Sequence, residues 1–173
     1  MDFDSLRQAI LAFVEANRGW TPAIAAVLAF CESLAFLSLI VPATVILVAV
    51  GALIGALGLP FWPTVAAAAA GAALGDWVSY EAGLYLGPRA RGVWPMRAYP
   101  RMVERGEDFV RRWGAAAVAL GRFFGPARAM VPLVAGMLGL ARLPFQAANV
   151  LSAILWAFVL LAPGAGLLTW LTG

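Results

Sequence analysis

Four charged side chains lie inside or beside long apolar runs of this sequence: the acids Glu32 and Asp76, and the arginines Arg122 and Arg128. Glu81 is a fifth, nearer the end of its apolar segment. An unpaired charge at bilayer depth costs on the order of 3 kcal/mol, so each of these groups must pair or face water. Mutual neutralisation that holds the chain together is one explanation. A buried ion pair stabilises less than apolar side chains of similar size, which makes a function the better explanation.

The two arginines flank Gly125 and Pro126, which disfavour a continuous helix between them. We therefore predict a loop that projects both guanidinium groups into one cavity. Exposed backbone N–H groups and the N-terminus of the following half-helix favour an anion at such a loop. Two guanidiniums match phosphate or carboxylate with paired hydrogen bonds. Arg122, Arg128, Gly125 and Pro126 are thus predicted to bind an anion at membrane depth, and the motif does not choose which one.

An acid beside such a site can release or accept a proton as the anion enters and leaves. Glu32 is the better candidate, because the surrounding apolar run penalises its charged form. Asp76 is expected either to orient an arginine or to bond Tyr80, which follows one helical turn later. For Tyr80, Trp77 and Trp156, packing or anchoring at the membrane interface is the favoured role.

The elements that carry these residues are predicted from the apolar runs. Hydrophobic residues make up 63% of the 173 positions and charged residues 12%, against about 25% charged in a soluble domain. No charged residue occurs from Ser33 to Gly75 or from Leu143 to Gly173. Because about 20 apolar residues cross a bilayer core, the chain is predicted to be a single-domain, all-α integral membrane protein. No secretory signal peptide is expected, since the N-terminus lacks a basic region and a cleavage pattern.

The interruptions divide the chain further. The run 22–59 is too long for one crossing, is broken at Pro42 and has no polar turn that could separate two crossings, so we predict a hairpin that re-enters the membrane. Pro100 and Gly114 mark the two ends of a surface helix. The predicted segments are an interfacial helix 3–18, a re-entrant hairpin 22–59, a transmembrane helix 61–87, an Arg-rich loop and helix 88–113, a second re-entrant hairpin 114–141 and a transmembrane helix 143–172.

The Arg-rich loop 88–113 sets the expected orientation. Arginines outnumber acids there, and such a basic excess next to membrane segments belongs on the cytoplasmic side. The N-terminal 20 residues are then on the opposite side of the membrane from this loop, provided that 22–59 is re-entrant.

The two broken segments correspond to each other. Glu32 precedes Pro42 by ten residues, and Arg122 precedes Pro132, which interrupts the second segment, by ten. A glycine-rich stretch and a Leu-Pro-Phe triplet follow each break and lead into a full crossing. Because one crossing separates the two halves, the second half enters from the opposite face. This predicts an inverted repeat whose broken helices meet at a substrate site near the midplane.

Three motifs occur in a characteristic order: Glu32 to Pro42, Gly75-Asp76 with Ser79-Tyr80 and Gly83, and Arg122-Phe123-Phe124-Gly125-Pro126-Ala127-Arg128 leading to Pro132 and Ala135-Gly136-Met137. With these motifs the chain resembles the DedA family, also called the SNARE-associated or VTT-domain superfamily, over residues 20–165. The resemblance implies a polytopic lipid transporter with two opposed re-entrant hairpins. Bacterial members are implicated in returning undecaprenyl phosphate across the cytoplasmic membrane, some of them using the proton motive force, and eukaryotic relatives scramble phospholipids.

Carried over by position, the family's essential acid falls on Glu32 and its two essential arginines on Arg122 and Arg128. One departure concerns Thr44, which stands where many members have a second acid. Threonine can form hydrogen bonds but does not titrate, so the resemblance does not carry a two-acid proton-coupling scheme over to this chain.

The leading hypothesis is a multi-pass flippase of the bacterial cytoplasmic membrane that moves a lipid phosphate, with undecaprenyl phosphate favoured. The alternatives are a proton-coupled ion or drug antiporter, a passive phospholipid scramblase and a structural scaffold. No enzyme, metal, cofactor or nucleic-acid partner is predicted, because the chain has no His or Lys, a single Cys31 and no acid cluster. The lipid, the direction, the coupling ion and the oligomeric state, a homo-oligomer included, stay open.

Overall fold

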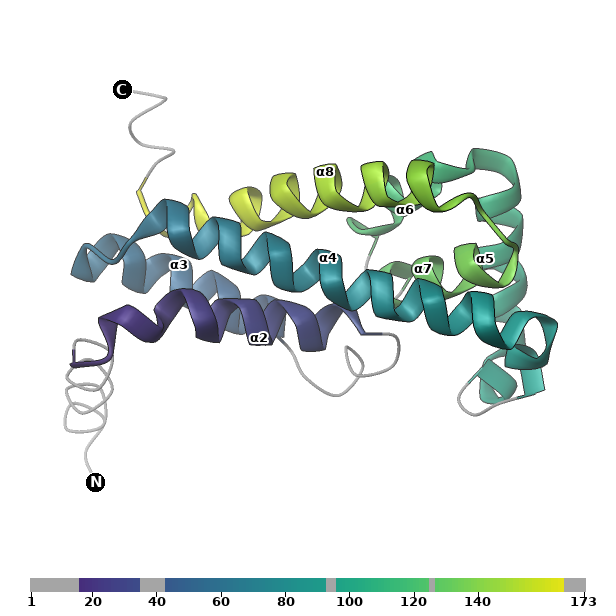
Figure 1. Cartoon of the computed structure of the whole chain (residues 1–173). Coiled ribbons are helices and arrows are strands. Elements are labelled where there is room, and N and C mark those ends of the chain that lie inside the picture. The colour runs from purple at the N-terminus through teal and green to yellow at the C-terminus, as the bar shows by residue number, and fades with distance from the viewer. Residues whose placement is uncertain (1–15, 35–42, 93–95, 125–126, 167–173) are drawn as a thin grey trace.

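The chain forms an elongated helical bundle in the computed structural model, which describes residues 16–34, 43–92, 96–124 and 127–166 (Figure 1). Every regular element in these ranges is helical, as predicted. The elements are η1 (Arg18–Trp20), α2 (Thr21–Ser33), α3 (Ala43–Leu57), α4 (Phe61–Leu86), η3 (Gly87–Gly92), η4 (Met96–Ala98), α5 (Pro100–Trp113), α6 (Ala115–Gly121), α7 (Ala127–Met137) and α8 (Arg142–Leu161). Most of the predicted interfacial helix 3–18 lies outside the described residues.

The two longest helices, α4 and α8, overlap the segments 61–87 and 143–172 that were predicted to cross the membrane. At 1.5 Å per residue, the 26 residues of α4 span about 39 Å and the 20 residues of α8 about 30 Å. Within the described residues, α8 is the one helix long and apolar enough to cross a bilayer by length and composition. It ends at Leu161, and residues 162–166, which include Pro163 and Gly164, form turns, so the predicted transmembrane helix 143–172 extends too far.

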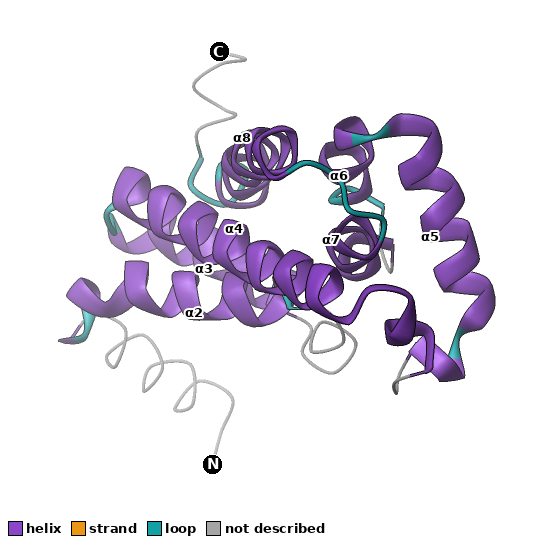
Figure 2. Ribbon diagram, turned by 45° about the vertical axis from the view of Figure 1, so that its right-hand side comes forward, coloured by secondary structure: helices purple, strands orange, loops and turns teal. Residues whose placement is uncertain are grey.

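Helices α4 and α8 run antiparallel along the bundle, and the shorter helices pack around them (Figures 1 and 2). The ring centroids of Phe61 and Phe158 lie 6.0 Å apart near one end, and those of Tyr80 and Phe145 lie 4.1 Å apart near the other. Helix α2 packs along the first half of α4, and α7 packs along its second half. Helix α4 therefore packs against α2, α7 and α8.

Glycines on α4 allow its neighbours to approach to backbone distance. A Cβ atom on Gly71 would lie 2.1 Å from the carbonyl oxygen of Ala26 on α2, and one on Gly83 would lie 2.0 Å from that of Leu133 on α7. Gly71 and Gly83 thus permit close helix contact, as small residues do at the interfaces of membrane helices. Gly87 has a different role, because its φ of 52° ends α4 in a conformation that favours glycine.

One of the breaks predicted in the segment 114–141 is absent. Pro132 lies inside α7, so the prediction that it interrupts the segment is wrong. A proline at this position removes one helical hydrogen bond, a loss that the packed helix tolerates. Helix α7 begins directly after Pro126, as α3 begins directly after Pro42. Pro126 is therefore the positional counterpart of Pro42.

The Arg-rich loop contains the predicted surface helix. Helix α5 begins at Pro100 and ends at Trp113, before Gly114, whose φ is 54°. Its buried residues include Glu107, which accepts a 2.8 Å hydrogen bond from Nε of Arg91 on η3. Hydrogen bonds to this carboxylate raise the pKa of Arg91 above its ordinary value.

The two largest apolar cores among the described residues lie at opposite ends of the bundle, with polar residues between them. One core joins α2, α3, the first half of α4 and the second half of α8, and the other joins the second half of α4 with α5, α6, α7 and the start of α8. Along α4, Ala72 belongs to the first core and Tyr80 to the second, with buried Asp76 and Ser79 between them. We call the buried polar residues at this level the polar layer: Glu32, Ser33, Asp76, Ser79, Arg122, Asn149 and Ser152, with the partly buried Arg128.

The outward faces of the long helices are apolar. Large exposed hydrophobic residues occur on α2, α4 and α8, among them Val27, Trp62, Leu151 and Leu155. Soluble monomers rarely expose contiguous apolar surface on this scale. The bundle therefore has apolar side chains on its outer face as well as in its cores, with the polar layer between the cores, as expected for a protein surrounded by lipid.

Candidate functional site

Arg122 directly follows α6, and its buried guanidinium contacts residues of α4 and α8. It forms an ion pair with Asp76 of α4 through one terminal nitrogen. The same nitrogen donates to Oδ1 of Asn149 at 2.7 Å, and Nε donates to Oγ of Ser152 at 3.0 Å. The side chains of Arg122 and Asp76 are 2% and 8% exposed, so the pair is shielded from solvent.

Asn149 and Ser152 on α8 hold this guanidinium in place. The Asn149 amide nitrogen donates to the carbonyl oxygen of Ala73 at 2.9 Å, which turns its oxygen toward the arginine. Ser152 donates its hydroxyl proton to the carbonyl oxygen of Asn149 at 3.1 Å, so its lone pairs remain for Arg122. Hydrogen bonds to backbone carbonyl groups thus orient the acceptor oxygens of Asn149 and Ser152 independently of Arg122.

Arg128, in the first turn of α7, is held by a second set of partners. One terminal nitrogen lies 2.8 Å from Oε1 of Glu32, and the other lies 3.5 Å from Oγ of Ser33. Its guanidinium carbon sits 4.6 Å from the ring centroid of Trp156 on α8, in cation–π geometry. The Arg128 side chain is 11% exposed, which makes it more accessible than Arg122.

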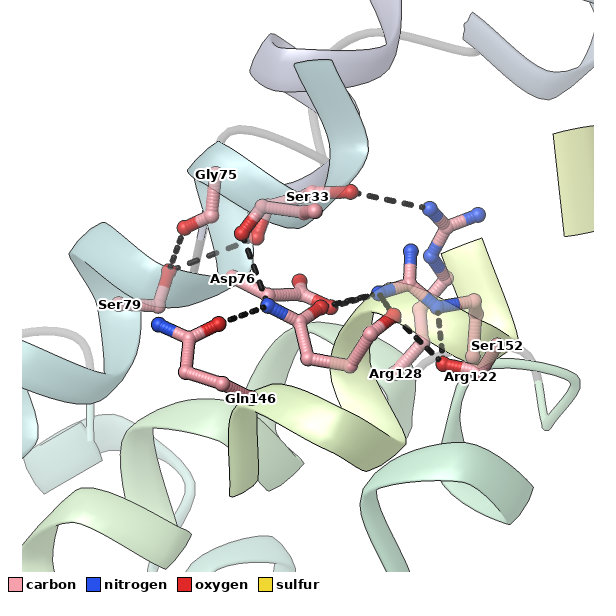
Figure 3. A network of polar contacts seen from close by, with 10 residues as sticks. Ser33, Gly75, Asp76, Ser79, Arg122, Arg128, Gln146 and Ser152 are labelled. Carbon is pink, nitrogen blue, oxygen red and sulfur yellow. Dashed lines mark hydrogen bonds and ion pairs between the residues drawn. The ribbon is translucent and has the colours of Figure 1, made fainter. Parts of the chain in front are cut away.

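The two ion pairs belong to one cluster. Figure 3 shows both arginines in a single network with Ser33, Asp76 and Ser152. Asp76 also lies within electrostatic range of Arg128. Both acids come from the first 87 residues and both arginines from residues 114–141, and two of each sign leave the cluster without net formal charge. One terminal nitrogen of Arg122 is buried and has no hydrogen-bond partner among the described residues.

The other predicted site residues have different positions. Asp76 orients an arginine, which was one of its two predicted roles, while Tyr80 donates to the carbonyl oxygen of Leu140. Thr44 is the second residue of α3, and its side chain lies outside the described atoms. Gly125 and Pro126 fall between the described ranges, so their predicted part in the anion site is outside the structure's description.

Sequence reasoning missed Asn149, Ser152 and Ser33 as members of the site and treated Trp156 as packing. A signal was present: Gln146, Asn149, Ser152 and Trp156 recur at three- and four-residue spacing on an otherwise apolar span. That spacing puts these side chains on one face of α8, the face that meets Arg122 and Arg128.

The arrangement supplies donors for anion recognition. Two guanidiniums offer donors matched to phosphate or carboxylate. The described residues contain no group of three or more Cys, Asp or Glu side chains that could hold a metal ion. An incoming anion would have to displace a carboxylate from an arginine, so binding at this cluster is an exchange of partners.

Comparison with known proteins identifies the family. A family model described as the VTT domain matches residues 41–166, most of the chain. The chain belongs to the VTT-domain (DedA) family. Asp76, Arg122 and Arg128 lie within the VTT-domain match, and Glu32 lies just before it.

Several curated VTT-domain relatives are similar along most of this chain. Inner membrane protein YabI of Escherichia coli strain K12 is 36% identical over 137 residues, which are 79% of this chain and 54% of YabI. Inner membrane protein YqjA of the same strain is 33% identical over 141 residues, 80% of this chain and 63% of YqjA. An uncharacterized membrane protein of Buchnera aphidicola is 29% identical over 155 residues, 90% of this chain and 60% of that protein. The chain spans little more than half of such relatives, and no solved structure matches it.

We predict that Asp76→Asn lowers the free energy of unfolding by about 3–5 kcal/mol, because it leaves the buried Arg122 charge without a compensating partner. Thermal unfolding in detergent measures the loss. Glu81→Gln is the matched control on the same helix, since it breaks the exposed pair with Arg142 and should leave the melting temperature unchanged. Adding Arg122→Gln to Asp76→Asn should recover part of the loss. Equal destabilisation by Asp76→Asn and Glu81→Gln would contradict the burial argument.

Proposed function

We propose that this chain moves a lipid phosphate between the leaflets of a bacterial cytoplasmic membrane, with undecaprenyl phosphate as the favoured substrate. The observation that carries the proposal is the charge-balanced cluster of two acids and two arginines between two apolar cores. A lipid phosphate needs the two environments found here: a cationic site for the head group and an apolar exterior that leaves the tail in the bilayer.

Charge balance suggests how such a site would work. With Glu32 on Arg128 and Asp76 on Arg122, the cluster is neutral, and an added phosphate would leave uncompensated negative charge at low dielectric. Protonation of Glu32 releases Arg128 to the phosphate and preserves neutrality when the phosphate carries one negative charge. Loss of that proton returns Glu32 to Arg128 and expels the phosphate. Phosphate and proton would therefore move together.

Arg128 is the better first contact for the head group. Arg122 is enclosed by Asp76, Asn149 and Ser152, whereas Arg128 has Glu32 at 2.8 Å and a longer contact to Ser33. The greater exposure of Arg128 also leaves a path for an incoming group. Arg122 would complete the phosphate site with its terminal nitrogen that lacks a partner among the described residues.

Helix contacts support the inverted repeat on which this scheme depends. The pairs α2–α4 and α6–α8 have matching places in the two halves, as have α3–α8 and α7–α4, and all four pairs are in contact. Helices α2 and α6 reach the polar layer at their C-terminal ends, where Glu32 and Arg122 lie. Opposed hairpins of this kind place a substrate site near the midplane.

Helix lengths support re-entrance. Helices α2, α3, α6 and α7 have 13, 15, 7 and 11 residues, each fewer than the about 20 that cross a bilayer core. Two hairpins built from such helices would dip into the membrane and return. The named relatives YabI and YqjA are inner membrane proteins, which supports the bacterial location proposed for this chain.

We expect Arg128→Lys to slow lipid-phosphate transport roughly tenfold, because an ammonium keeps the charge but loses the planar pair of donors. Arg122→Lys should have a similar effect. Transport of polyprenyl phosphate into the opposite leaflet of proteoliposomes provides the measurement. Arg142→Lys is the control, since Arg142 forms an exposed pair with Glu81 away from the polar layer. Wild-type rates in both site variants would show that these side chains do not chelate phosphate.

Glu32→Gln should abolish transport that depends on a pH difference, because glutamine cannot titrate. It should also lower the free energy of unfolding, though less than Asp76→Asn does, because the Arg128 guanidinium that loses its carboxylate is more exposed than that of Arg122 and lies against Trp156. The same proteoliposomes with and without an imposed pH difference measure the transport. Thr44→Glu should be tolerated and should strengthen the dependence, since it adds a second titrating acid. Full gradient-dependent transport by Glu32→Gln would limit Glu32 to structural pairing. A wild type that ignores the gradient would instead indicate a passive scramblase.

Re-entrance predicts that the Arg-rich loop is cytoplasmic while both termini lie on the other side, because only α4 and α8 would cross completely. Single cysteines at Glu104 and Gly173, in a background with Cys31→Ser, test this with a thiol reagent that does not cross membranes. Opposite-side labelling is expected. Labelling of both positions from the same side would mean an additional full crossing and would rule the scheme out.

A further inference from the structure

A second site lies outside the polar layer. A cavity of about 500 Å³ opens between α5 and α7, and it is lined by Met102, Arg105, Gly106, Phe109, Phe124, Met130 and Val131. Neither Arg122 nor Arg128 lines it, so the transport scheme leaves this cavity unused. Its volume lies within the range of pockets that enclose small organic ligands.

The walls of the cavity suit a hydrocarbon chain. Six of its seven lining residues are apolar or glycine, and they come from α5, α7 and the loop after α6. Met102 and Phe109 are one heptad apart and therefore share one face of α5. Phe124 on the opposite wall is 64% exposed, which leaves apolar surface accessible from outside the bundle.

The rim of the cavity carries positive charge. Arg105 is the charged lining residue, it is exposed, and it forms no ion pair with another described residue. Arg101 and Arg112 lie four residues before and seven residues after it, so the three share one side of α5. Tyr99 and Trp113, at the two ends of the helix, are about half exposed, as expected for anchors at a membrane interface.

We propose that this cavity binds one hydrocarbon chain of an anionic phospholipid, with the lipid phosphate held by Arg105. An apolar cavity bordered by an unneutralised arginine is complementary to an amphiphile of that charge, and each arginine near a membrane surface attracts anionic lipid. The site is separate from the proposed transport site and does not depend on it.

The test uses the full-length protein in lipid nanodiscs that contain phosphatidylglycerol with a photoreactive diazirine in one chain. After irradiation, mass spectrometry should locate the label on Met102, Phe109, Phe124 or Met130. Phosphatidylcholine with the same chain should label these residues several-fold less, because it carries no net charge. Equal labelling by the two lipids would overturn the role of Arg105, and absence of label from these four residues would overturn the site.

Two variants test the contact between Arg105 and the lipid head group. Arg105→Gln should reduce labelling about fivefold, the effect of one surface arginine on an anionic lipid. Arg111→Gln removes the same charge from the same helix outside the cavity and should leave labelling unchanged. Equal labelling in these two variants would contradict the proposal.

Gly106→Leu should fill the cavity and abolish labelling, since its Cβ meets only a Val134 methyl at 3.4 Å and the helix gains a better helix former. Met102→Trp provides a second filling variant. Unchanged labelling in both would contradict a chain inside the cavity. If Gly106→Leu instead converts a dimer to a monomer in detergent and no lipid label is found, the cavity belongs to a second copy, and the lipid proposal fails.

Discussion

The structure depends on two buried ion pairs that join distant parts of the chain: Glu32 with Arg128, and Asp76 with Arg122. Each pair connects helices that are far apart in sequence, and each is enclosed by apolar packing. A charge at this depth cannot be left alone without a cost of several kcal/mol, so the helices that carry the pairs must keep their relative positions. The same constraint would limit function, because any anion that takes an arginine must be balanced by a proton or by movement of a carboxylate.

Close backbone packing makes these pairs geometrically possible. Gly71 and Gly75 bring α2 against α4, which places the C-terminal end of α2, with Glu32, beside the level of Asp76. Gly83 and Gly136 do the same for α7, which carries Arg128. A methyl group at any of these glycines would meet backbone atoms of the neighbouring helix at less than 3.0 Å. The glycines therefore contribute to the site through distance, although none of them contacts an ionised group.

Stability alone does not explain the polar layer. Apolar side chains of similar volume would stabilise the bundle at least as well as buried ion pairs do. The additional acceptors on α8 orient Arg122 with Asn149 and Ser152, and Trp156 covers the guanidinium of Arg128. Such detailed orientation of two cations, in a bundle whose outer surface is apolar, is what a membrane-depth anion site requires. It is the physical basis for preferring transport to a scaffold.

Much of this protein is determined locally and could be predicted from the sequence. Apolar runs predict the all-α fold and the places of α4 and α8 in the chain, and Pro100 and Gly114 delimit α5. The cost of burying a charge depends on its immediate surroundings, so charges inside apolar runs identify the site residues Glu32, Asp76, Arg122 and Arg128. The choice of partners was not accessible in this way. Positional symmetry sets Glu32 against Arg122, whereas the folded chain pairs Arg122 with Asp76, adds Asn149 and Ser152, and keeps Pro132 within a helix. These outcomes depend on the rotation and register of helices packed against one another, which only the tertiary structure decides.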